Sequence, residues 1–224
     1  MESHKTSMRF SKKLYPLTIC NYILPLLLTL ILWKESGAQH IDTIIKKDVY
    51  TSYYSYAMKS PLYVMYYLYQ GGGDCSRKKL TFKSEYKSAV NKDYIKSGYD
   101  RGHLVNAEDF AFDCEKEKCT FSYYNCMAQH PTLNRGSWKS WETTIRKESQ
   151  FNILKIYTGA IYGNSTIGNG VRVPEHCWKV VYNTKTKLIT HILLFKNDET
   201  EAVQRVTLSQ LKNLLHYPIE FNGE

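Results

Sequence analysis

The sequence predicts an α+β fold with a mostly antiparallel sheet and flanking helices. Runs rich in β-branched and aromatic residues, a composition typical of strands, recur along most of the chain. Two of these runs are separated only by the short polar stretch "TKTK", which indicates an antiparallel hairpin. Helical spacing of apolar residues is confined to two stretches in the second half of the chain, so helices are few.

The first elements follow from the tyrosine-rich segment. Residues 39–59 are expected to form an irregular lead-in, and "PLYVMYYLYQ" at 61–70 a strand. "GGGD" at 71–74 is expected to turn the chain into a returning strand, "KKLTFK", at 78–83. The tyrosines of 61–70 could stack nucleobases, but a strand that buries its rings and keeps its hydroxyls wet is the favoured interpretation.

The remaining elements come from periodicity and turn chemistry. They are strands at 120–129 and 151–162, a helix at 132–150, a hairpin of 176–183 with 188–198, and a helix at 207–216. Thr132 or Asn134 could cap the first helix. No linker divides residues 40–224, so the 60–224 region is expected to be one domain.

The N-terminus has the pattern of an export signal. Three basic residues within positions 9–13 precede 20 uncharged residues (14–33), and the small residues of "SGA" end at Ala38. Cleavage before Gln39 is the favoured interpretation, and an uncleaved anchor is the alternative because the run has nearly the length of a spanning helix. Residues 1–38 are therefore excluded from the fold. The protein is expected to be secreted or periplasmic, and to meet a membrane only if this segment is retained.

The chain is basic. Its formal net charge is +9, and the 25 basic and 19 acidic residues that follow position 38 still leave +6. A basic body fits a polyanion, since neutralising each phosphate releases counterions. A solvated basic surface with no particular partner is the alternative, so charge alone does not establish a nucleic-acid partner.

Five cysteines follow position 38: Cys75, Cys114, Cys119, Cys126 and Cys177. Export would place them in an oxidising compartment. Cys114 and Cys119 flank the charged stretch "EKEK" and could close it as a disulfide. The odd number leaves at least one thiol unpaired within the chain, and the absence of a C-x-x-C pair makes a zinc site improbable.

Four consecutive residues, Asp100-Arg101-Gly102-His103, form the first cluster with potential for catalysis. His103 could act as a general base because an ordinary histidine pKa, about 6.5, lies near working pH. Arg101 offers a planar fork to a phosphate, and Gly102 allows close approach of the backbone to a ligand. Asp100 could orient a neighbour or be a base itself. Taken alone, the cluster fits a polar turn beside a core histidine at least as well.

The second cluster lies on the helix expected near Asn134. Asn134 and Glu142 present a carboxamide oxygen and a carboxylate on one helix face. Mg²⁺ takes oxygen ligands and keeps several waters, so Asn134 could bind it directly and Glu142 could hold its waters. Each residue alone would be read as a helix cap or a solvated side chain. Together the two clusters supply a base, a cation site and a phosphate contact, the requirements of phosphodiester hydrolysis.

Four stretches occur in a characteristic order and spacing: "SGYDRGHLVNAEDF", "TFSYYNCMAQHPTLNRGSWKSWE", "YTGAIYG" and "VPEHCWKVVY". With them the chain resembles the DNA/RNA non-specific endonuclease family, nucleases with a ββα-metal active site, over roughly residues 60–220. The resemblance implies a metal-dependent endonuclease that cleaves DNA and RNA with little sequence preference and leaves 5′-phosphate ends. Mg²⁺ is the implied cofactor, with Mn²⁺ as a substitute.

The resemblance also implies roles for single residues. His103 would be the general base, Asn134 the direct Mg²⁺ ligand and Glu142 the acid that organises metal-bound water. Further implied residues are Arg101 on the phosphate, Asp100, Gly102, Asn125 and Gln129 as supporting positions, and Arg135 as a nucleic-acid contact. The family also carries an arginine on an early hairpin, for which Arg77 is the candidate, with Lys78 nearly as good because the local spacing is loose.

The chain departs from the family in Ala128-Gln129, where Pro-Gln is usual, with Pro131 nearby and His130 as an added imidazole. This difference is expected to shift a loop without removing function. Activity is expected to fall as His103 protonates at acid pH.

Two rival hypotheses remain. One is a catalytically silent protein of the same fold that binds extracellular nucleic acid. The other is a nuclease used as a toxin or effector, and the sequence does not decide whether a protein inhibitor accompanies it. DNA versus RNA preference, metal identity and oligomeric state do not follow from the sequence.

Overall fold

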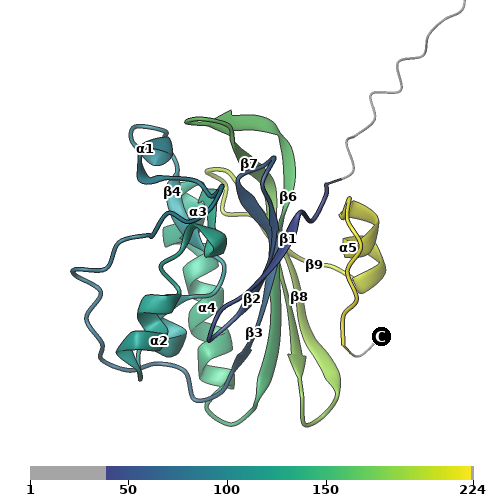
Figure 1. Cartoon of the computed structure of the whole chain (residues 1–224). Helices are drawn as coiled ribbons and strands as arrows, with labels where there is room; N and C mark the ends of the chain where they lie inside the picture. Colours follow the sequence, from purple (N-terminus) through teal and green to yellow (C-terminus); the bar gives the residue numbers. More distant parts are fainter. Residues whose placement is uncertain (1–38, 223–224) are drawn as a thin grey trace, which may run out of the picture. The chain divides into compact units, whose positions relative to one another are not determined.

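A seven-stranded sheet forms the centre of the structure, a computed structural model that describes residues 39–222 (Figure 1). The strand order is β1-β2-β3-β6-β7-β8-β9, and every neighbouring pair is antiparallel. The strands are β1 Thr43–Lys46, β2 Thr51–Ser55, β3 Ser60–Leu68, β6 Leu154–Ile167, β7 Val171–Asn183, β8 Leu188–Lys196 and β9 Val203–Arg205. The predicted α+β class is confirmed.

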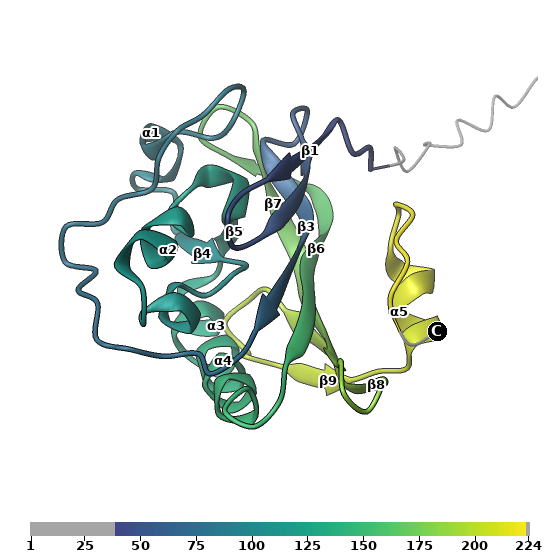
Figure 2. The same cartoon turned by 60° about the horizontal axis from the view of Figure 1, so that its bottom comes forward.

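The helices and a second, two-stranded sheet lie mainly on one face of the large sheet. Figures 1 and 2 show α1 to α4 with β4 and β5 on that face, and α5 on the other. The helices are α1 Asn91–Tyr94, α2 Cys114–Cys119, α3 Pro131–Arg135, α4 Ser137–Glu148 and α5 Leu208–Leu214, with 3₁₀ turns at Ala107–Phe110 and Tyr123–Asn125. The small sheet pairs β4 Asp100–His103 with β5 Cys126–Gln129. The predicted signal or anchor at 1–38 lies outside the described residues, and within 39–222 no helix is long and apolar enough to cross a membrane.

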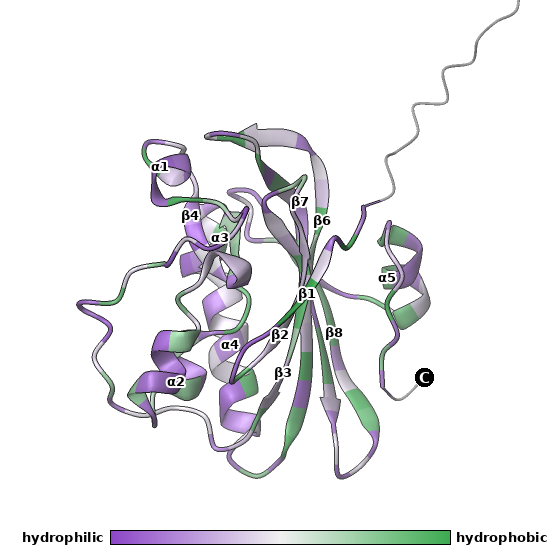
Figure 3. Cartoon of the chain, in the orientation of Figure 1, coloured by the Kyte–Doolittle hydropathy of each residue, from purple (hydrophilic) through white to green (hydrophobic). Residues whose placement is uncertain are grey.

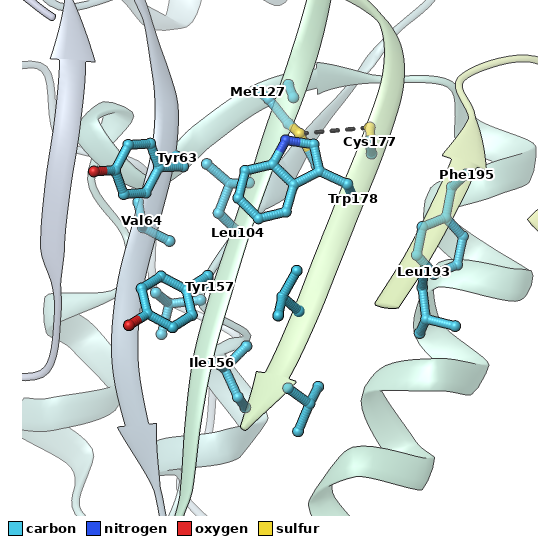
Figure 4. Close-up of a cluster of buried hydrophobic side chains, with 14 of the residues drawn as sticks. Tyr63, Val64, Leu104, Met127, Ile156, Tyr157, Cys177, Trp178, Leu193 and Phe195 are labelled. Atoms are coloured by element: carbon cyan, nitrogen blue, oxygen red, sulfur yellow. Dashed lines mark hydrogen bonds between the residues drawn. The ribbon is translucent and has the colours of Figure 1, made fainter. Parts of the chain in front are cut away.

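The core lies on the central strands, where Figure 3 shows the apolar residues gathered. Trp178 and Leu193 are fully buried on β7 and β8, and Leu104 and Met127 reach them from the small sheet (Figure 4). Cys177 lies 3.6 Å from the sulfur of Met127. The small sheet is therefore attached to the large one by buried apolar contacts, which fix the position of the DRGH segment.

The region before residue 90 differs from its prediction at two places. Residues 39–59 are not irregular, because alternation of half-buried and exposed residues at 43–46 and of half-buried and buried residues within 51–55 allows β1 and β2 to pair with the sheet. Residues 78–83 do not return as a strand and make only an isolated bridge from Lys83 to Ser122. The physical reason is that β3 already pairs with β2 and β6, so neither of its edges is free.

The tyrosines of residues 61–70 were expected either to be buried in a strand or to be exposed for stacking on nucleobases, and the structure contains tyrosines of both kinds. Tyr63 and Tyr66 are buried, as the strand interpretation requires, whereas Tyr67 and Tyr69 are about half exposed. Tyr63 stacks on Tyr53 of the neighbouring strand with ring centroids 4.1 Å apart. The run is thus a strand whose buried rings belong to the core.

A single disulfide joins the described cysteines, and it is not the predicted one. Cys75 bonds Cys114, whereas Cys119 is free. Cys114 and Cys119 are the two ends of α2, and side chains five positions apart on a helix point to different sides. The bond ties the loop that carries Arg77 to α2. Cys126 and Cys177 are buried and free, so the prediction of at least one unpaired thiol is confirmed.

The later elements follow the prediction with shifted bounds. The expected helix at 132–150 is divided at Gly136, whose backbone is not helical and where a Cβ would clash with the Glu201 carboxylate. Neither Thr132 nor Asn134 is its cap, because His130 accepts from the Thr132 N–H with Pro131 at the first position. The hairpin around "TKTK" is confirmed as β7 and β8, and α5 begins at a Thr207 cap that bonds Gln210.

Candidate active site

The β4–β5 ribbon positions the DRGH segment. Arg101 and His103 alternate with Asp100 and Gly102 along β4, and Gly102 pairs with Met127. A Cβ on Gly102 would lie 2.3 Å from Oε1 of the fully buried Gln129, so only glycine fits. Gly102 and Gln129, both predicted as supporting positions, are thus in close contact with each other behind the cleft.

Asn125 fixes the backbone that leaves His103. Its Oδ1 accepts from the Val105 N–H at 2.8 Å, and its Nδ2 donates to the carbonyls of Val105 and Thr120 at 3.0 and 2.9 Å. The side chain is fully buried. Asn125 therefore acts on the path of the chain rather than on a ligand.

His103 lies between two aromatic rings at the edge of the cleft. The ring centroids of Phe82 and Phe121 are 4.5 and 4.7 Å from the imidazole. Nε2 is enclosed with no hydrogen-bond partner among residues 39–222. Burial, with a smaller contribution from the positive charge of Arg77, lowers the pKa of His103 to about 3. Burial therefore favours the neutral imidazole, so His103 is expected to protonate only well below the pH at which an ordinary histidine does.

Asp100 holds Asn134 in place. Asn134 Nδ2 donates to Asp100 Oδ2 at 2.9 Å, and Arg135 donates to both carboxylate oxygens at 2.9 and 2.7 Å. Burial opposes ionisation of Asp100, but the bonds from Arg135 and Asn134 outweigh it and lower its pKa. Since the Asn134 amide nitrogen is committed to Asp100, its oxygen is left for the cleft that Asn134 lines.

Glu142 is a buried carboxylate on α4, not a solvated helix residue. Its side chain is 8% exposed, and Oε2 accepts a hydrogen bond from the amide of Asn106. The Lys179 ammonium lies 3.8 Å from Oε1. Burial raises the pKa of Glu142 to about 7, against the opposing charge of Lys179.

Asn106 and Lys179 are site residues that the sequence interpretation missed. Asn106 caps the 3₁₀ turn with Oδ1, which accepts from the Glu108 N–H at 2.7 Å and leaves its amide for Glu142. Lys179 is 1% exposed and lies 3.9 Å over the Trp138 ring. The available signal was a lysine between the apolar residues of "HCWKVVY", because a lysine is almost never buried unless it is paired.

A cleft of about 500 Å³ brings His103, Asn134 and Glu142 together. Five cationic side chains also line it: Arg77, Arg101, Arg135, Lys139 and Arg146. Lys78 is not among the lining residues, so the structure distinguishes it from its neighbour Arg77. The cleft thus combines a neutral imidazole and a buried carboxylate with a strongly basic wall.

The cations of the cleft differ in their partners. Arg77 pairs with Glu108 at 2.9 Å and is 3.7 Å from Glu117. The Arg101 guanidinium donates to the Tyr123 hydroxyl at 3.2 Å and to the Asn91 side chain at 2.6 Å. Arg146 bonds the buried Asp109 at 2.8 Å. Lys139 has no ion pair within residues 39–222 and is exposed.

The donor set suits a hard divalent cation. Asn134 Oδ1 makes no hydrogen bond within the described part of the chain, and Glu142 Oε1 is a buried oxygen without such a bond there. One amide oxygen and one carboxylate leave most of a coordination sphere to water, as Mg²⁺ prefers. These two side chains could therefore hold such an ion.

Comparison with known proteins gives a family and a fold. A sequence model described as "DNA/RNA non-specific endonuclease" matches residues 31–218. The mouse protein "Nuclease EXOG, mitochondrial" is 30% identical over 149 residues, 57% of this chain and 40% of that protein. Human "Endonuclease G, mitochondrial" is 29% identical over 128 residues, 49% and 43% of the two chains. A nuclease of Nostoc sp. is 36% identical over 93 residues, 39% and 33% of the two chains.

This chain therefore spans less than half the length of each of these three relatives. A solved structure titled "Crystal structure of the EndoG/EndoGI complex: Mechanism of EndoG inhibition" superposes with a TM-score of 0.68. Its sequence identity is 22%, and the match covers 79% of this chain and 85% of that one. The fold of residues 39–222 is therefore one already seen in a solved structure.

Proposed function

This chain belongs to the DNA/RNA non-specific endonuclease family, and from that premise we propose that it is a cation-dependent endonuclease that hydrolyses both DNA and RNA. One observation carries the proposal: a neutral histidine, a free amide oxygen and a buried carboxylate meet in one basic cleft, as His103, Asn134 and Glu142. A base, a cation site and fixed positive charge are what phosphodiester hydrolysis requires.

His103 is the proposed general base. Its Nε2 is enclosed, whereas Nδ1 is neither enclosed nor hydrogen-bonded among the described residues. The tautomer with its hydrogen on Nε2 leaves the Nδ1 lone pair to take a proton from a water in the cleft. Phe82 and Phe121 fix the ring by packing on it, which holds the base in one orientation.

Asn134 would hold a divalent cation through Oδ1, and Glu142 would hold it through water. Mg²⁺ is the proposed ion, with Mn²⁺ as a substitute, and when bound it would supply positive charge against the charge that builds on the phosphoryl and leaving oxygens. Asp100 orients Asn134 for this role, and Asn106 and Lys179 orient Glu142.

The basic wall is proposed to hold the phosphate backbone. The charge of Arg77 acts on His103, so Arg77 is the cation proposed to contact the reacting phosphate, with Arg101 and Arg135 lining the same cleft. Arginine forks match phosphate oxygens and carry no sequence information. Attack of water on phosphorus with departure of the 3′ oxygen leaves 5′-phosphate ends, and little sequence preference is expected.

The test is cleavage of supercoiled plasmid DNA and single-stranded RNA by the purified protein with Mg²⁺. Both substrates are expected to be cut, and excess EDTA is expected to stop both reactions. A protein that binds the two polymers but cuts neither with Mg²⁺, Mn²⁺ or Ca²⁺ would instead be a catalytically silent binder.

The pH dependence of the rate should follow Glu142 rather than His103. The pKa of His103 is about 3 and that of Glu142 about 7, so on acidification Glu142 gains its proton first and loses the charge that holds the cation. A bound cation favours the ionised carboxylate, so the midpoint of kcat/KM against pH should fall as Mg²⁺ rises. A midpoint of the pH profile near 6.5 that does not change with Mg²⁺ concentration would instead indicate that a histidine of ordinary pKa controls the rate.

Export remains a proposal that rests on the N-terminal sequence alone. The mouse and human relatives carry the word "mitochondrial" in their names, so a mitochondrial address is the competing proposal. Sequencing the N-terminus of the mature protein, and finding where it accumulates, decides between them.

A further inference from the structure

A second pocket, of about 390 Å³, adjoins the cleft. Arg101 and Asn134 line both hollows, so the two share a wall. A phosphodiester that reaches Asn134 in the cleft therefore has this second pocket beside it. The next groups along a nucleic-acid strand from any phosphate are a sugar and its base.

Three aromatic rings and one leucine form the apolar part of this pocket. Leu80, Phe82, Tyr99 and Phe121 line it, and each is half-buried, so part of each side chain stays open. We call it the aromatic pocket. Phe82 packs on Phe121 with centroids 5.4 Å apart, and both Phe82 and Tyr99 pack on a buried cluster of the core. The core therefore supports these two rings from behind.

Apart from Thr81, the polar side chains on the rim of the aromatic pocket already make internal bonds. The Asp100 carboxylate accepts from Asn134 and Arg135, and Asn91 Oδ1 accepts from Arg101. The rim thus offers few free groups to select the edge of one base or a 2′-hydroxyl. Besides the Thr81 hydroxyl, the pocket offers for recognition the flat apolar surface of its rings.

We propose that the aromatic pocket receives a nucleobase next to the phosphate being cleaved, held by the faces of Tyr99 and Phe82. This inference rests on the proposed function. Aromatic side chains stack on every base, because every base has a π-face, so this contact discriminates neither bases nor sugars. A base can enter only when it is unstacked, which costs least in a single strand. Single-stranded substrates should therefore gain affinity that an intact duplex lacks.

Tyr99 is the residue to change, because Phe82 and Phe121 also pack on His103. Tyr99→Ala is expected to raise KM for a single-stranded oligonucleotide roughly 5- to 100-fold, with kcat and duplex nicking nearly unchanged. Tyr99→Phe keeps the ring and should behave as wild type. Tyr69→Ala removes a tyrosine that is about half exposed away from both hollows and serves as the matched control. An equal loss on single strand and duplex would show that Tyr99 acts through the fold and would overturn the proposal.

A second measurement needs no variant. A single strand of thymidines with one abasic position is cut by wild type, and cleavage beside the missing base should fall by a similar factor. Uniform cleavage across the abasic position would overturn the aromatic pocket while leaving the nuclease assignment intact. No cleavage of any substrate by wild type would instead contradict the proposed function itself.

Discussion

His103→Ala is expected to lower kcat on both plasmid DNA and RNA by about 10²- to 10⁴-fold, the usual contribution of a positioned general base. The reason is that His103 is the neutral imidazole of the cleft, with one nitrogen enclosed and the other open. KM should change little, because the cations that hold the phosphate remain. Initial rates at saturating substrate and Mg²⁺ measure the effect.

Alanine also leaves a gap between Phe82 and Phe121, so loss of base and loss of packing must be separated. Added imidazole can occupy that gap and should restore part of the rate to His103→Ala, which a purely structural defect would not allow. His216→Ala, at an exposed histidine on the other side of the sheet, is the control and should leave the rate unchanged. Undiminished cleavage by His103→Ala would remove His103 from the mechanism.

Lys179→Met is expected to destabilise the protein by about 3–5 kcal/mol near pH 8, the cost of breaking a buried ion pair from one side. Methionine keeps an unbranched chain beside Trp138, but Glu142 loses the buried ammonium 3.8 Å away. Glu142→Gln in the same chain removes the stranded charge and should recover most of the loss. Urea unfolding in EDTA measures all three proteins.

The loss of stability in Lys179→Met is expected to depend on pH, because Glu142 titrates. Burial already raises the folded pKa of Glu142 above its ordinary value of 4.5, and loss of Lys179 raises it further. An acid whose pKa is higher in the folded than in the unfolded protein stabilises the fold at pH values below its unfolded pKa. That contribution is lost as the pH rises through its folded pKa. The deficit of Lys179→Met should thus be small near pH 4.5 and full near pH 8. Lys196→Met, at an exposed lysine on β8, should show little deficit at either pH. An equal deficit of Lys179→Met at both pH values would mean that Lys179 acts only through packing.

The parts of the site that lie close in sequence were predictable. His103 and Asp100 belong to one strand, and Asn134 and Glu142 lie eight positions apart on the consecutive helices α3 and α4, so motif spacing was enough to find them. The β7–β8 hairpin was equally local, since four polar residues separate two apolar runs.

What the sequence could not give are contacts made between distant segments. Lys179 reaches Glu142 only because β7 passes beneath α4, and Asn106 reaches it across 36 positions of sequence. The misplaced strand at 78–83 has the same origin, because the bond of Cys75 to Cys114 and the occupied edges of β3 decide where that loop lies. The position of this loop also decides between Arg77 and Lys78, because only Arg77 lines the cleft.

In the proposed mechanism, one cleft activates water against the phosphodiesters of both DNA and RNA. This mechanism is tested by cutting a matched DNA and RNA strand in oxygen-18 water and determining the ends by mass spectrometry. We expect 5′-phosphates that carry one heavy oxygen and unlabelled 3′-hydroxyls on both polymers. RNA ends that are 2′,3′-cyclic phosphates, with the DNA strand left intact, would show that the ribose 2′-hydroxyl rather than water is the nucleophile, and would contradict it.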